Sequence, residues 1–258
     1  MPPGADPGPA LRLEGVRRTF RTGKRVVTAL DGITASAAPG GTTGLIGPDG
    51  AGKTTLMRLI AGLLRADAGR IEVLGLDVAR NPLAVQGRLG YMPQHFGLYD
   101  DLSVQENLEL GLNGSSRNDR RPRVAEMYET FPMLHDKRRQ LAGNLSGGEQ
   151  QILEMAMVLE ARPRVLLIDE PSLGLSPHAQ DEIFEIVRGV ADRGTPVVLA
   201  EQNVLRAARK SDRAVILIGG CLGADVDAAD IVAGTVDLHE AFLGRSASGG
   251  VNRSARAE

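Results

Sequence analysis

The sequence predicts an α/β fold in which helices cover a parallel sheet of buried strands. Residues Thr42–Ile46 have the pattern of a short buried strand and end in a glycine-rich loop. The next segment, Thr54–Leu64, places Leu56, Ile60 and Leu63 on one helical face. Strands and helices alternate in this way with short connections, which favours a parallel sheet. Further buried strands are predicted at Val165–Ile168, Val197–Leu199 and Ala214–Ile218.

A second amphipathic helix is predicted in the C-terminal half of the chain. Its apolar residues follow the spacing i, i+3, i+4 and i+7 of one helical face. They are Ile183, Ile186, Val187 and Val190. Pro177 precedes them as a helix opener and Gly194 follows as a stop signal, so both ends of the helix are marked.

The sequence pattern at about residues 98–145 predicts a helical insertion that interrupts the sheet core. Val104–Leu112 and Val124–Phe131 have helical patterns, and the stretch between them, Asn113–Arg123, is polar and charged. Its mixture of charged and apolar positions suits a partner interface, with a solvated lid as the alternative.

Length and composition limit the classes of protein to which the chain can belong. Its 258 residues are 42% hydrophobic, and 30 basic against 32 acidic side chains give a net charge of −2, which disfavours a nucleic-acid binder. The single cysteine, Cys221, excludes an internal disulfide, and no apolar stretch approaches the ~18–20 residues that cross a bilayer. We expect a cytoplasmic protein with one domain at residues 11–244, between disordered tails at 1–10 and 245–258.

The loop that follows Thr42–Ile46 fits the phosphate-binding pattern G-x-x-x-x-G-K-[ST], between a strand and a helix as that pattern requires. It comprises Gly47, Pro48, Asp49, Gly50, Ala51, Gly52, Lys53 and Thr54. Its glycines let backbone N–H groups turn towards phosphate oxygens, and the helix N-terminus adds partial positive charge. Lys53 can reach the β- and γ-phosphates, and the Thr54 hydroxyl can bind Mg²⁺. The alternative is a glycine-rich turn that matches by chance.

Two carboxylates follow the strand predicted at Val165–Ile168. Asp169 and Glu170 would emerge at the carboxyl edge of the sheet, where ligands of open α/β sheets bind. Asp169 can hold Mg²⁺ directly or through water, and Glu170 can orient or deprotonate an attacking water. An acidic pair at the end of a strand is common, so this prediction depends on the phosphate loop.

A second anion-binding helix start is predicted about a hundred residues after the first, at Leu145-Ser146-Gly147-Gly148-Glu149-Gln150. With these motifs the chain resembles the ATP-binding subunit of ABC transporters over about residues 11–244. The resemblance implies a RecA-like P-loop NTPase core with an antiparallel β subdomain and an inserted α-helical subdomain.

The same resemblance implies ATP as substrate, Mg²⁺ as cofactor and a working dimer of two ATP-binding subunits, identical or related. ATP would contact the phosphate loop up to Thr55, while Ser146, Gly147 and Gly148 cap ATP that is held by the opposing subunit. Transmembrane permease subunits are the implied partners, which would place the chain on the inner face of the cell membrane.

The resemblance assigns family roles to two further residues and one loop. Gln94 matches the glutamine that contacts Mg²⁺ and water and links to the membrane subunit, with an ordinary loop residue as the alternative. Phe20 sits where the family often places an aromatic that stacks on adenine, although a buried phenylalanine at a strand end fits equally. Residues Ser172–Ser176 match the loop that lines the dimer interface.

One position departs from the common family pattern. The switch histidine that contacts the γ-phosphate normally follows the last core strand, but Ala200-Glu201-Gln202-Asn203 stands there. Gln202 can donate a hydrogen bond to phosphate without titrating, whereas a histidine changes charge near neutral pH. The alternative is that Glu201 faces the nucleotide and Gln202 packs at the dimer interface.

The two halves of the chain resemble different transporter groups. The second half, including Gln202 and Glu240–Gly244, is most similar to ATPases of branched-chain amino-acid importers, and this interpretation is favoured. The first half, from Gly47 to Leu102, is more similar to ATPases of multidrug-type exporters. A soluble assembly ATPase that takes no part in transport is the alternative of another class.

Overall fold

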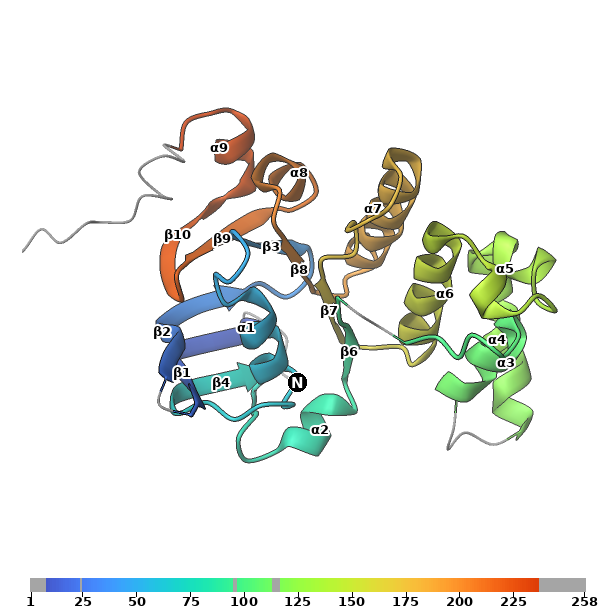
Figure 1. Ribbon diagram of the computed structural model, residues 1–258, viewed down its shortest axis with the longest axis horizontal. Helices are drawn as coiled ribbons and strands as arrows, with labels where there is room; N and C mark the ends of the chain where they lie inside the picture. The colour runs from blue at the N-terminus through green and yellow to red at the C-terminus, as the bar shows by residue number, and fades with distance from the viewer. Residues whose placement is uncertain (1–7, 24, 95–96, 113–116, 237–258) are drawn as a thin grey trace, which may run out of the picture.

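The computed structural model describes residues 8–23, 25–94, 97–112 and 117–236, which form two sheets flanked by helices (Figure 1). The larger sheet has six strands in the order β10-β9-β3-β8-β7-β6. These strands are β3 (Thr42–Ile46), β6 (Leu89–Met92), β7 (Val165–Asp169), β8 (Val197–Glu201), β9 (Arg213–Ile218) and β10 (Cys221–Asp227). Neighbouring strands from β9 to β6 are parallel, and β10 pairs antiparallel with β9. The predicted parallel sheet is therefore confirmed.

The smaller sheet is antiparallel, in the order β2-β1-β4-β5. Its strands are β1 (Leu11–Thr22), β2 (Arg25–Ala37), β4 (Ala68–Val73) and β5 (Leu76–Asp77). Helix α1 (Lys53–Ile60) packs between the two sheets, because its buried Leu56, Met57 and Ile60 join one apolar cluster with both of them. Local periodicity alone did not predict this sheet, whereas the family resemblance implied it.

The other helices of the described residues pack on the large sheet or on one another, and α3, α4 and α5 belong to the second group. They are α2 (Pro82–Gln86), α3 (Val104–Gly111), α4 (Arg117–Thr130), α5 (Pro132–Asp136), α6 (Gly147–Glu160), α7 (Pro177–Asp192), α8 (Val204–Arg209) and α9 (Ala228–Val232), with a 3₁₀ turn at Ala142–Asn144. One apolar cluster joins α3 to α7 with β6, β7 and β8, and a smaller one joins α8 and α9 with β9. Figure 1 shows α3, α4, α5 and α6 together on the side of the sheet away from α1.

The strands that carry the predicted site begin within one residue of the predicted positions. Helix α7 begins at Pro177 and ends at Asp192, two residues before Gly194, as its start and stop signals predict. Helices α3, α4 and α5 lie inside residues 98–145, where the helical insertion is predicted. Among the described residues, no helix is long and apolar enough to span a bilayer.

Two predicted boundaries are wrong. Helix α1 ends at Ile60 instead of Leu64, because Gly62 takes a left-handed φ of 67°, and Leu63 is 56% exposed instead of lying on the buried face. Helix α4 begins at Arg117, inside the polar stretch expected to separate two helices. Among the side chains described in this helix, from Arg120 on, the first buried one is Val124, so apolar periodicity does not mark the start of the helix.

The tails and the domain boundaries stay predictions for the most part. Residues 1–7 and 237–258, including Glu240–Gly244, lie outside the described residues. The chain is already ordered one residue before the predicted boundary, since Ala10 is buried and its carbonyl accepts a 2.8 Å hydrogen bond from the Leu74 N–H.

Candidate nucleotide site

The phosphate loop connects β3 to α1 and is packed so tightly that glycine is required at two positions. Gly52 has a φ of 103°, and a Cβ atom there would lie 2.6 Å from the carbonyl oxygen of Ala29. At Gly47 a Cβ atom would lie 2.3 Å from the carbonyl oxygen of Leu217. Both sheets therefore hold the loop in place, with β2 on one side and β9 on the other.

No side chain caps the start of helix α1. Its N-cap is Gly52, which has no side chain to accept from the first turn, and no acidic residue lies in that turn. The first N–H groups of a helix need outside partners, and the helix dipole favours an anion there. The start of α1 is thus suited to phosphate, as the sequence predicts.

Lys53 directs its charge to the mouth of this loop. Its Nζ donates to the carbonyl oxygens of Gly47 and Pro48 at 2.8 and 3.2 Å and lies 3.0 Å from Oε1 of Glu170. The lysine side chain is 4% exposed and the glutamate side chain 9% exposed, so this is a buried ion pair. The structure therefore brings the phosphate loop and the residue after β7 to one place.

Glu170 adopts a strained backbone that turns its carboxylate towards Lys53 and Gln94. Its φ is 52°, a left-handed value that is uncommon for a residue other than glycine, and its N–H donates to the Ala200 carbonyl at 3.0 Å. Gln94 follows β6 and donates from Nε2 to Oε2 of Glu170 at 3.1 Å. Strain of this kind gathers at functional sites, which agrees with the catalytic role predicted for Glu170.

Asp169 is a buried carboxylate that suits a cation ligand. It is 1% exposed, and neither oxygen accepts a well-formed hydrogen bond from the described residues. Burial raises its pKa, and the nearby Thr54 hydroxyl opposes that shift. A buried acceptor without a donor is costly, and a cation bound there would remove that cost.

The donors near Asp169 match the preferences of Mg²⁺. No cluster of three or more acidic, histidine or cysteine side chains suited to a metal occurs in the described part of the chain. Mg²⁺ is usually held by one or two carboxylates together with substrate phosphates. Asp169, the Thr54 hydroxyl and the Gln94 amide oxygen, next to a phosphate loop, fit such a site.

Ser146, Gly147 and Gly148 lie at the start of α6, in the helical part of the molecule and away from α1 (Figure 1). Ser146 and Gly147 are exposed. A Cβ atom at Gly148 would lie 2.8 Å from the Cβ atom of Ala179, so this glycine lets α6 approach the start of α7 closely. The structure thus does not bring these residues to the phosphate loop of their own chain.

The end of β8 separates the two candidates for the switch residue. Glu201 is 3% exposed, and its carbonyl accepts from the Gly47 N–H at 3.4 Å, whereas Gln202 is exposed. Burial raises the pKa of Glu201, and the neighbouring Ser172 hydroxyl opposes the shift. The contact of Gln202 with the γ-phosphate remains a prediction.

The stacking of Phe20 on adenine also remains a prediction. Phe20 is a half-buried residue of β1, and its ring centroid lies 4.8 Å from the Arg18 guanidinium carbon.

Sequence reasoning missed the side chains that hold loop 172–176. Gln180 donates to the carbonyl oxygens of Ser172 and Leu175 at 2.9 and 3.0 Å, and Arg206 donates to the Ser172 hydroxyl at 3.5 Å. Glutamine and arginine are common on helices, so nothing in the local pattern marks these two. They fix the loop between Glu170 and α7 from within the same chain.

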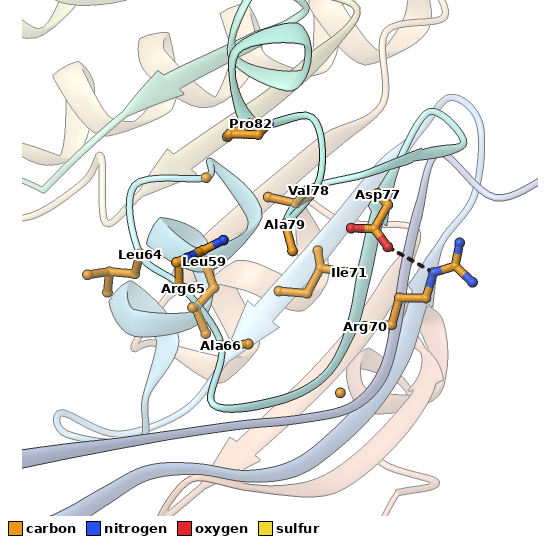
Figure 2. A pocket seen from close by; sticks show the side chains of 12 residues that line it. Leu59, Leu64, Arg65, Ala66, Arg70, Ile71, Asp77, Val78, Ala79 and Pro82 are labelled. Carbon is orange, nitrogen blue, oxygen red and sulfur yellow. Dashed lines mark ion pairs between the residues drawn. The ribbon is translucent and has the colours of Figure 1, made fainter.

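A separate cavity of about 570 Å³ lies between the end of α1 and the strands β4 and β5. Figure 2 shows its lining, with Ile71 and Val78 on the apolar side and the Arg70–Asp77 ion pair at one side. None of the predicted site residues lines it. The predicted nucleotide site, at the phosphate loop and the ends of β6, β7 and β8, is therefore separate from this cavity.

Comparison with known proteins agrees with this geometry. Residues 30–173 match the family described as "ABC transporter". The chain is 43% identical over 190 residues to the probable multidrug ABC transporter ATP-binding protein YbhF of Escherichia coli, a match that covers 71% of this chain and 32% of YbhF. It therefore spans about a third of the length of that relative.

Two other proteins match over most of their own length. The branched-chain amino acid transport ATP-binding protein BraG of Pseudomonas aeruginosa is 35% identical over 196 residues, 75% of this chain and 84% of BraG. The ADP conformation of the ATP-binding cassette MJ1267 superposes with a TM-score of 0.76 and 25% identity, over 92% of this chain and 99% of that structure. The chain therefore belongs to the ABC transporter family and carries its ATPase domain.

Proposed function

We propose that this chain is the ATP-hydrolysing subunit of a membrane transporter and that it works as a head-to-tail dimer. ATP then lies between Lys53 of one copy and Ser146 of the other. The observation that carries the proposal is that the starts of α1 and α6, both predicted to bind anions, lie in separate parts of one chain. Only a second copy, identical or related, brings both to one γ-phosphate.

In the proposed site each residue has one role. The loop from Gly47 to Thr55 binds the phosphates, and Lys53 stabilises their negative charge. Asp169, Thr54 and Gln94 would hold Mg²⁺, which would supply charge neutralisation to the bound phosphates. Glu170 orients and deprotonates the attacking water, and Gln202 donates to the γ-phosphate.

The helical insertion, at about residues 98–145, forms the proposed contact with a membrane permease together with Gln94. Tyr99 is 61% exposed, yet its backbone is fixed because the buried Asn107 accepts from its N–H at 3.0 Å and donates to its carbonyl at 3.1 Å. The carbonyl of Leu102 accepts from the Ala142 N–H at 2.9 Å, four residues before Ser146. A movement forced on Tyr99 would thereby reach the start of α6.

Two cargo classes have support from different observations. Uptake of branched-chain amino acids is favoured by Gln202, by the run from Ser146 to Ser176 and by the match to BraG. Export by a multidrug-type system is favoured by the run from Gly47 to Leu102 and by the higher identity to YbhF. Under either proposal the chain lies on the inner face of the membrane, bound to its permease.

The proposal is tested with the full chain reconstituted in vesicles with a candidate permease. Transport should require ATP and should be lost in Lys53→Ala. Tyr99→Ala, alone and with Leu102→Ala, should keep ATP binding but uncouple hydrolysis from transport. Leucine and a cationic drug as cargoes distinguish uptake from export. ATP hydrolysis without a permease that binds would favour the assembly ATPase instead.

A further inference from the structure

The carboxylate of Glu149 lies at the start of α6, where the γ-phosphate binds in the proposed dimer. Oε2 of Glu149 accepts from the Ser146 N–H at 2.9 Å, and the Glu149 N–H donates to the Ser146 hydroxyl at 3.5 Å. This capping box orders the helix start. Its negative charge nevertheless repels any phosphate that approaches the same N–H groups, because like charges at short range cost free energy.

Lys137 neutralises that charge. Its Nζ forms an ion pair with Oε1 of Glu149, so the carboxylate contacts Lys137 through one oxygen and Ser146 through the other. The two side chains are 33% and 26% exposed, which keeps the pair partly shielded from solvent. The hydrogen bond from Lys137 is the main reason that the pKa of Glu149 is lowered, with the Ser146 N–H next.

Helix α3 offers an internal comparison because it begins with the same capping box. Ser103 donates from its N–H to Oε2 of Glu106 at 2.8 Å, and the Ser103 hydroxyl donates to the same oxygen at 2.6 Å. The pKa of Glu106 is lowered by Ser103, and no cation among the described residues contributes to that shift. A capping box in this chain thus forms without a lysine.

The backbone around Lys137 is fixed on the side that leads to the proposed permease contact. The Lys137 carbonyl accepts from the Gln140 N–H at 2.8 Å, and the next carbonyl, that of Arg138, accepts from the Gln105 N–H in α3 at 3.1 Å. Lys137 is therefore placed by α3 and α5 rather than by α6 itself. It joins the helical insertion to the start of α6.

We propose that Lys137 is a positioning residue for the ATP held by the opposing copy: it neutralises Glu149 and so allows Ser146, Gly147 and Gly148 to receive the γ-phosphate. This inference rests on the proposed head-to-tail dimer. Lys137 acts through Glu149, and in this scheme it has no contact with ATP on the phosphate loop of its own chain.

The test measures ATP-driven dimerisation of the full chain by sedimentation, with Glu170→Gln as the parent because it blocks turnover. Lys137→Met removes the charge and should weaken the ATP-bound dimer roughly three- to ten-fold, as expected for one charge at a helix N-terminus. ATP affinity of the monomer should not change. Adding Glu149→Gln should restore dimerisation, because glutamine caps a helix without a charge. Lys137→Arg should match the parent.

Two control variants distinguish this role from a general loss of charge or of a cap. Lys210→Met breaks the Lys210–Glu185 ion pair, which spans 3.2 Å, and Glu106→Gln removes the charge from the other capping box. Both should dimerise like the parent. Normal dimerisation of Lys137→Met, or no recovery with Glu149→Gln, would overturn the inference. If the parent itself fails to dimerise with ATP, the head-to-tail site is wrong, and the role of Lys137 falls with it.

Discussion

Lys53 and Glu170 form a buried ion pair, with Nζ of the phosphate-loop lysine 3.0 Å from Oε1 of the carboxylate after β7. The cation proposed to bind phosphate and the proposed general base therefore neutralise each other in this structure. Phosphate offers Lys53 a second anion, so nucleotide binding and the freeing of Glu170 are linked. Removing either partner affects the other, and variants at this pair have to be designed with that in mind.

Glu170→Gln should retain ATP binding and lose turnover. The amide keeps the shape of the side chain and can still contact Gln94, while Lys53 keeps its bonds to the carbonyls of Gly47 and Pro48. A missing general base typically lowers a rate by about 10²–10⁴-fold. Phosphate release and equilibrium ATP binding measure the two effects, and full turnover in this variant would refute the assignment.

Lys53→Ala should weaken ATP binding and also destabilise the protein. It leaves Glu170 buried without its cation, and breaking one side of a buried pair costs about 3–5 kcal/mol. Urea unfolding should show this loss, and the double variant Lys53→Ala/Glu170→Gln should recover much of the stability but none of the ATP affinity. Equal stability of the single and double variants would show that the ion pair contributes little.

Gln202→Ala should cut turnover much more than ATP binding. Losing one preorganised donor to a transition state typically lowers the rate by about 10²–10³-fold. Glu201→Ala is the matched variant, because Glu201 is the neighbouring residue and is buried beside the phosphate loop. Gln202→His should restore part of the activity, with a pH dependence near neutrality. If only Glu201→Ala loses turnover, the switch lies one residue earlier.

Glu160 should make the protein less stable as the pH rises from acid to neutral. It is 1% exposed, its oxygens have no hydrogen-bond partner among the described residues, and burial raises its pKa from 4.5 to about 7. The folded chain therefore binds this proton more tightly than the unfolded chain, so stability falls through the window from 4.5 to 7.

Glu160→Gln should remove that penalty. Above neutral pH the free energy of unfolding of the variant, measured with urea, should exceed that of the parent by about 1–3 kcal/mol. One pKa unit corresponds to about 1.4 kcal/mol. At pH values below about 4.5 the two proteins should be equally stable. Equal stability of the parent and the variant above neutral pH would contradict this expectation.

The phosphate loop and the Asp169–Glu170 pair were predictable because each is a short run beside a buried strand. Their meeting follows from parallel strand order, which puts the carboxyl ends of β3 and β7 on one edge. Other features depend on contacts that are distant in sequence. The first turns of α4 are polar and charged, the paired ends of β1 and β2 carry exposed side chains such as Val26, and Lys137 reaches Glu149 from the end of α5.

The sharpest test of the shared ATP site is a mixture of two inactive variants, Lys53→Ala and Ser146→Arg. Each variant alone should show no turnover, because both of its sites are damaged. In a head-to-tail heterodimer one site combines the intact Lys53 with the intact Ser146, so an equal mixture should recover up to about a quarter of the parent rate in single turnover. If each chain worked with its own Ser146, mixing would restore nothing, and the central claim would be contradicted.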